Sequence, residues 1–125
     1  MRPERPASED NQGGLSREIF LTRDFFNLVR SGLKTLELRV AFPSFSRISF
    51  GDIVVFSSGR GEKISVKITS VRRYQTLEEI LTSEDLTKLA PGMTVETARA
   101  AGRSLFKESD IKKHGLLILG FEKVV

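Results

Sequence analysis

The 125-residue chain has no cysteine and only one histidine. Without cysteine it forms no disulfide and offers no thiolate, and one histidine argues against a zinc cluster. No apolar run approaches membrane-spanning length, and the start MRPERPASED lacks the apolar core of a secretion signal. These absences favour a soluble, cytoplasmic protein with no metal, no cofactor and no membrane partner.

A length of 125 residues suits a single compact domain. Twenty Lys and Arg against sixteen Asp and Glu give a net charge of +4, which permits an anionic partner without requiring one. Residues 1–14 are rich in Pro, Gly, Ser and charge, and no large apolar side chain follows Met1. We therefore expect a disordered tail over residues 1–14 and one domain over residues 15–125.

The first half of the chain predicts four strands and one helix. A short strand near residues 19–21 precedes a helix that Thr22 can cap and that ends at Gly32. A strand over residues 34–40 and a loop come next. The segments IVVF and KISVKITSV, joined by the turn SGRGE, then predict a β-hairpin.

The second half is mostly helical. Thr76 and Glu79 have the spacing of a capping box, and Ser83, Thr94 and Ser109 are the next candidate helix caps. The closing run GLLILGF is apolar on both alternating faces, which is typical of a central strand. Strands early, helices late and a closing strand together indicate an α+β domain.

The segment SGLKTLELR, residues 31–39, contains a helix stop, a turn and a two-faced strand. Its strand alternates apolar side chains with polar ones, Leu36, Leu38 and Val40 against Thr35, Glu37 and Arg39. The polar face is either an ordinary solvated sheet surface with a Glu37–Arg39 pair, or the wall of a functional site.

The chain resembles the ASCH family of the PUA-like superfamily. The resemblance rests on GLKTLELR at residues 32–39, the pair Gly51 and Asp52, VRRY at residues 71–74, and the closing HGLLILGFE. It implies a PUA-like curved β-barrel of about five to six strands with flanking helices. It also implies a cleft lined by the GLKTLELR strand, and RNA-related work for many members.

Some small ASCH proteins hydrolyse acetylated cytidine, with a threonine three residues after the signature lysine as nucleophile. In this chain Lys34 is that lysine, and Glu37 occupies the position of the threonine. A carboxylate does not replace an activated hydroxyl in this chemistry. Thr35 supplies a hydroxyl, but strand alternation separates it from Lys34 unless the chain turns after Gly32.

Two groups of residues are candidate ligand contacts. Lys34, Thr35, Glu37 and Arg39 can contact a phosphate and orient a nucleoside, with Lys34 as a base if burial lowers its pKa. Arg72, Arg73 and Tyr74 combine two cations with an aromatic ring, which suits phosphate attraction and base stacking. The alternatives are a structural ion pair and an ordinary surface.

The remaining candidates are His114, the stretch GRGEK and the phenylalanines. His114, after Lys112 and Lys113, is a general acid or base only if it reaches the cleft. The stretch GRGEK lacks the spacing of a phosphate-binding loop. Most phenylalanines should face the core (Phe25, Phe26, Phe50, Phe56, Phe106 and Phe121), whereas Phe42 and Phe45 are candidates for base stacking.

The sequence thus favours a domain that binds RNA or a modified nucleoside. The alternative is a metal-independent hydrolase that acts on an acetylated cytidine-type nucleoside or on single-stranded RNA, with Lys34 and Glu37 as its acid–base pair. A regulatory domain with a protein partner has no positive sign in the sequence.

Overall fold

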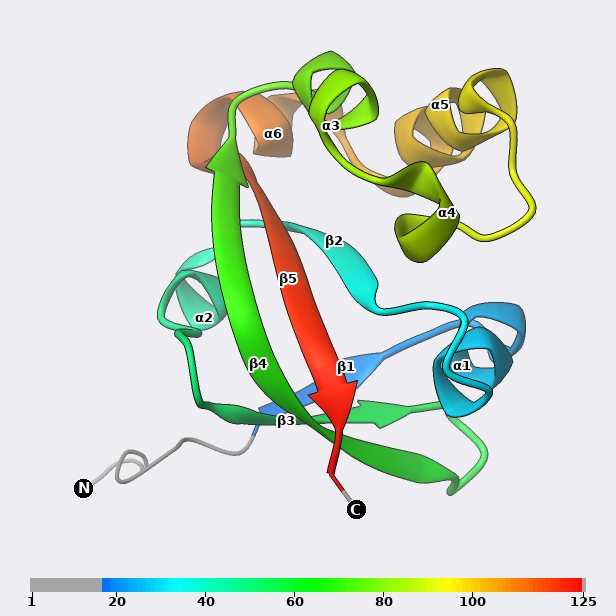
Figure 1. Ribbon diagram of the computed structural model, residues 1–125. Helices are drawn as coiled ribbons and strands as arrows, with labels where there is room; N and C mark the ends of the chain where they lie inside the picture. Colours follow the sequence, from blue (N-terminus) through cyan, green and yellow to red (C-terminus); the bar gives the residue numbers. More distant parts are fainter. Residues whose placement is uncertain (1–16, 125) are drawn as a thin grey trace.

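The computed structural model describes residues 17–124, so the tail expected over residues 1–14 lies outside the described residues. The centre of the domain is a mixed five-stranded sheet, which is curved into a half-barrel (Figure 1). β1 pairs with β3 in parallel, and all other neighbours are antiparallel. The strands follow the spatial order β1 (Arg17–Phe20), β3 (Ile53–Ser57), β4 (Lys63–Tyr74), β5 (Leu116–Lys123) and β2 (Leu36–Val40).

Helices flank this sheet at both ends. In Figure 1, α3 to α6 gather at one end of the long strands β4 and β5, and α1 lies near the other end. The expected α+β fold, a PUA-like curved β-barrel of about five to six strands with flanking helices, is confirmed, with five strands that form a half-barrel. The helices span α1 (Arg23–Arg30), α2 (Pro43–Ser46), α3 (Leu77–Ser83), α4 (Leu86–Leu89), α5 (Val95–Leu105) and α6 (Glu108–His114).

β5 is buried on both faces, as its apolar sequence predicts. Leu119 and Phe121 belong to a core cluster with α1, β1, β3 and β4, whereas Leu116 and Ile118 belong to a second cluster with β2 and the late helices. Alternate side chains of a strand point to opposite sides, so one strand serves both cores. The predicted central strand and the β3–β4 hairpin are confirmed.

Some of the predicted helix caps are confirmed and others are not. Thr22 and Thr94 cap α1 and α5, and Thr76 with Glu79 forms a capping box at α3. Ser83 does not cap α4; the carboxylate of Asp85 accepts from the Thr87 N–H instead.

Three further expectations are wrong. The last helix, α6, begins at Glu108 rather than at Ser109. The expected loop around residue 43 contains the short helix α2, which Pro43 starts because its fixed φ suits a first helical turn. Phe50 is 73% exposed and lies outside the core, because it belongs to the turn between α2 and β3.

None of the helices over residues 17–124 is both long and apolar enough to cross a membrane. Across the same residues, His, Asp and Glu side chains form no group of three that could hold a metal ion.

Candidate functional site

The turn between α1 and β2 places Lys34 on the same side of the sheet as Glu37. Gly32 has φ +86°, a conformation that favours glycine, and the N–H groups of Leu33 and Lys34 both donate to the carbonyl of Leu28. β2 therefore begins at Leu36 rather than at Lys34. Because Lys34 precedes the strand, the alternation of the strand does not fix where its side chain points.

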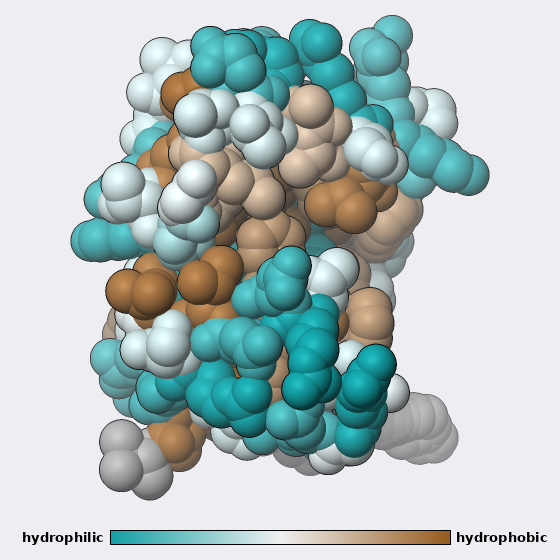
Figure 2. All heavy atoms as spheres, turned by 90° about the vertical axis from the view of Figure 1, so that its right-hand side faces the viewer, coloured by the Kyte–Doolittle hydropathy of each residue, from teal (hydrophilic) through white to brown (hydrophobic). Residues whose placement is uncertain are grey.

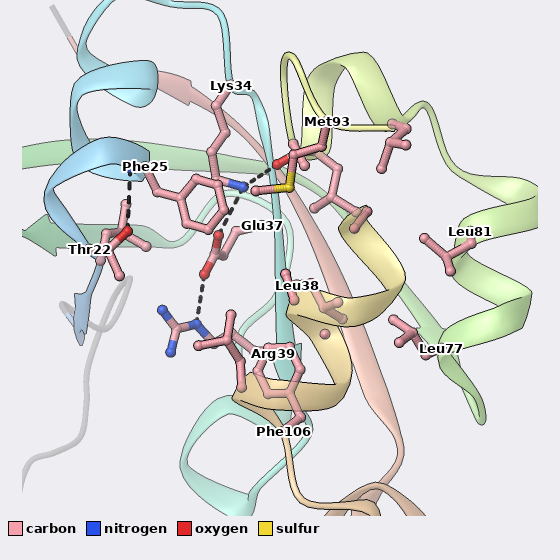
Figure 3. Close-up of a pocket in the computed structure, with 18 of the residues that line it drawn as sticks. Thr22, Phe25, Lys34, Glu37, Leu38, Arg39, Leu77, Leu81, Met93 and Phe106 are labelled. Carbon is pink, nitrogen blue, oxygen red and sulfur yellow. Dashed lines mark hydrogen bonds and ion pairs between the residues drawn. The ribbon is translucent and has the colours of Figure 1, made fainter. Parts of the chain in front are cut away.

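Lys34, Glu37 and Arg39 form one continuous ionic network (Figure 3). Oε1 of Glu37 lies 3.1 Å from Nζ of Lys34, and Oε2 lies 2.8 Å from Nε of Arg39. Lys34 and Glu37 are buried, at 2% and 5% exposure. The carboxylate of Glu37 is thus held between two cations, in a place where water screens the charges weakly.

The ammonium group of Lys34 has acceptors for all three of its hydrogens. Besides Glu37, it donates to the carbonyls of Leu36 and Leu89, both at 2.6 Å. Its Nζ also lies 5.0 Å from the centre of the Phe25 ring, within cation–π range. Burial lowers the pKa of Lys34, and the carboxylate of Glu37 opposes that shift. Lys34 therefore fixes Glu37 and joins β2 to the end of α4.

Arg39 retains hydrogen-bond donors. Its Nε donates to Glu37, and its Nη2 donates to the carbonyl of Phe20 at 2.6 Å. Within residues 17–124 its Nη1 has no hydrogen-bond partner, and its side chain is 24% exposed. The guanidinium is consequently oriented by two bonds while one edge stays available.

These three side chains form one wall of a cavity of about 250 Å³, which we call the Glu37 pocket. One side of the pocket is formed by β2 and the start of α1, and the other side is formed by α3, α4 and α5. Figure 2, which faces the right-hand side of Figure 1, shows the surface hollowed near its middle, with mainly hydrophilic residues below the hollow.

The lining of the Glu37 pocket is mostly apolar. Only four of its nineteen residues have polar side chains, Thr22, Lys34, Glu37 and Arg39. The apolar side chains come mainly from the helices and include Leu77, Leu81, Met93, Ala101, Leu105 and Phe106. A few polar groups in an apolar cavity is the usual composition of a small-molecule site. Thr35 is not part of this lining.

Arg72 lies outside the Glu37 pocket and supports the fold. Its guanidinium donates to both carboxylate oxygens of Glu84 at 2.7 and 2.6 Å, and Glu84 also accepts from the hydroxyl of Tyr74. The bond from Arg72 lowers the pKa of Glu84, and the bond to Glu84 raises the pKa of Tyr74. This triad ties the end of β4 to the segment between α3 and α4.

Arg73 and Tyr74 border a second, more open cleft of about 770 Å³. The same cleft is lined by Lys112, Lys113 and His114 of α6, and it shares no residue with the Glu37 pocket. The structure thus places Lys34, Glu37 and Arg39 at one site and Arg73 and Tyr74 at another, while Thr35 and Arg72 line neither.

The aromatic side chains also differ from expectation. Phe42 packs on the His114 ring at 5.0 Å and on the second core cluster, and Phe45 packs on the first. Phe20, in contrast, is 58% exposed at the Glu37 pocket. Phe25 and Phe106 pack on the two core clusters, as expected, and also line the pocket. The sequence signal for the exposure of Phe20 is strand alternation, which puts its side chain on the face opposite the buried Ile19 and Leu21.

The fold and the pocket define a PUA-like domain with a curved sheet and a partly ionic pocket on β2. A family model described as the ASCH domain matches residues 19–125, so the chain belongs to the ASCH domain family. Members of this family are generally thought to bind RNA.

Solved structures share the fold of this chain. The chain is similar to hypothetical protein PH0355, at 26% identity, with 88% of this chain and 100% of that chain covered and a TM-score of 0.79. It is similar to protein PF0455 from Pyrococcus furiosus, at 25% identity, 88% and 98% coverage and a TM-score of 0.71. An ASCH domain from Lactobacillus crispatus shares the fold, at 17% identity, 86% and 79% coverage and a TM-score of 0.58. Among curated proteins, none matches this chain.

Proposed function

We propose that the chain binds RNA, or a modified nucleoside within RNA, in the Glu37 pocket. The observation that carries this proposal is the fixed pair of Glu37 and Arg39 at one wall of an otherwise apolar cavity. Such a wall offers an acceptor and a donor side by side, as the edge of a nucleobase requires. The family to which the chain belongs adds support.

Each residue of the pair has a distinct role in this proposal. Each carboxylate oxygen of Glu37 already accepts one bond and has a second lone pair for an amino or imino hydrogen of a base. The edge of Arg39 around Nη1 donates to a carbonyl or phosphate oxygen. Lys34, whose hydrogens are all engaged, acts as a positioning residue for Glu37.

Phe20 provides an aromatic surface beside these polar groups. It lines the pocket, is 58% exposed, and its carbonyl holds the guanidinium of Arg39. A base that stacks on the ring of Phe20 would lie at the Glu37 pocket, which Arg39 also lines. Stacking on an aromatic ring accepts any base, so sequence preference would come from Glu37 and Arg39.

Replacement of Arg39 tests the proposal. We expect Arg39→Ala to weaken binding of a fluorescein-labelled single-stranded RNA about tenfold, since lost charge-assisted hydrogen bonds cost about 1.5–3 kcal/mol. Arg39→Lys should recover only part of the affinity, because a lysine keeps the charge but not the planar donor edge. Fluorescence anisotropy at low salt measures the RNA affinity of both variants.

The matched control for Arg39→Ala is Arg60→Ala, which removes the same charge from the exposed β3–β4 turn. Circular dichroism verifies that each variant is folded. Equal affinities of Arg39→Ala and Arg60→Ala would contradict the proposal, as would a wild-type chain that binds no RNA at low salt.

A metal-independent hydrolase is the second candidate. It is favoured by one observation, that burial lowers the pKa of Lys34 beside the carboxylate of Glu37 in a pocket. It is opposed by the full set of hydrogen bonds on Lys34 and by the lack of a hydroxyl at position 37. The lining of the Glu37 pocket does include the hydroxyl of Thr22, but this hydroxyl caps α1.

Turnover assays in EDTA separate the two candidates. We expect neither the wild type nor Glu37→Gln to release acetate from N4-acetylcytidine, or to cleave single-stranded RNA, above the buffer rate. Chromatography of the products after long incubation measures both reactions. Turnover by the wild type that Glu37→Gln abolishes would establish the hydrolase and displace simple binding.

A further inference from the structure

The second cleft concentrates positive charge from two elements that are distant in sequence. Arg73 comes from the end of β4, and Lys112 and Lys113 come from the last turn of α6. The side chain of His114 and the ring of Tyr74 complete this wall. We call this surface the Lys112 cleft.

The three cations of the Lys112 cleft are not fully neutralised within the described part of the chain. Over residues 17–124 none of them forms an ion pair, whereas Lys34, Lys63 and Arg99 all do. Glu79 also lines the cleft, and its carboxylate, which accepts from the N–H groups of Gln75 and Thr76, offsets one of the three positive charges. The cleft therefore carries a local excess of positive charge.

One hydrogen bond to the protein orients the exposed side chain of Arg73. Its Nη2 donates to the carbonyl of Ser46 at 2.8 Å, and no partner within residues 17–124 engages its Nε or Nη1. An arginine that is already ordered loses less conformational entropy when it binds an anion. The free edge of the guanidinium suits two oxygens of a phosphate.

The lysines of α6 have a simpler interpretation, because cations near a helix C-terminus complement the helix dipole. That effect accounts for Lys112 and Lys113 but not for Arg73, which belongs to a strand. The helix dipole also does not explain why a cleft of about 770 Å³ lies between the end of β4 and α6. Convergence of the three cations on one concavity is the feature that points to an anionic ligand.

We propose that the Lys112 cleft binds phosphodiester groups of an RNA strand, in addition to the contact in the Glu37 pocket. This inference rests on the proposed function. The chemistry of the two sites is complementary: the Glu37 pocket is mostly apolar and suits a base, whereas the Lys112 cleft is polar and cationic and suits the backbone. The backbone contact adds affinity without sequence preference.

The salt dependence of binding tests the inference. For single-stranded RNA, the logarithm of the association constant falls with the logarithm of salt concentration by about 0.7 per neutralised phosphate. The double variant Lys112→Ala, Lys113→Ala should therefore reduce this slope by about 1.4. Its matched control is Arg60→Ala, Lys67→Ala, which removes the same charge from exposed positions of the β3–β4 hairpin.

The outcomes separate this inference from the proposed function. A reduced slope for the Lys112, Lys113 variant and an unchanged slope for the control support the cleft. Identical slopes for the two variants overturn the cleft, and the Glu37 pocket still stands if Arg39→Ala weakens binding. A wild-type chain that binds no RNA at any salt concentration overturns both. Thermal unfolding checks that all variants are folded.

Discussion

Glu37→Leu is expected to lower the free energy of unfolding by about 3–5 kcal/mol, because it leaves the buried ammonium of Lys34 without its anion. Lys34 is 2% exposed, and its remaining partners would be the carbonyls of Leu36 and Leu89. A neutral carbonyl compensates a buried charge less well than a carboxylate does. Urea denaturation followed by circular dichroism measures the loss.

A double-mutant cycle isolates the ionic contribution. Lys34→Met together with Glu37→Leu should be more stable than Glu37→Leu alone, since the double variant removes the isolated charge as well. The exposed pair Lys63 and Glu18 provides the control, and its disruption should leave the urea midpoint nearly unchanged. If Glu37→Leu shifts the midpoint no more than that control, the network is not a buried structural element.

The second large effect is expected at Gly120, in the middle of β5. Gly120→Ala should lower the free energy of unfolding by about 1–3 kcal/mol, because the added methyl group overlaps Oγ of Ser70 on β4. Ser70 lies opposite Gly120, next to the β-bulge at residues 68–70, and its hydroxyl accepts a bond from Arg72. The same denaturation experiment measures this loss.

Removal of the Ser70 hydroxyl should relieve the overlap. In the double variant Ser70→Ala, Gly120→Ala the two methyl groups would be 3.5 Å apart, which is an ordinary contact. We therefore expect the double variant to recover most of the stability lost in Gly120→Ala. Ser70→Ala alone measures the cost of the lost bond to Arg72. A double variant no more stable than Gly120→Ala would refute this explanation.

The sequence was sufficient for local features whose cause lies within a few residues. The alternation in LELRV predicts that Glu37 and Arg39 share a face, and the spacing of Thr76 and Glu79 predicts the capping box. Lys34 is different, because its direction depends on the turn after Gly32 and on the carbonyl of Leu89, 55 residues away. Local patterning cannot predict a contact of that kind.

By itself the sequence determined the α+β class, the central position of β5 and the resemblance to the ASCH family, since apolar periodicity and short motifs are local properties of the chain. Tertiary packing alone decided that α3, α4 and α5 close an apolar wall over Glu37 and Arg39. It also decided that Arg72 is bound by Glu84 while Arg73 joins Lys112 and Lys113 in another cleft. Adjacent side chains on a strand point to opposite sides, so the helices packed against each side determine what each residue can contact.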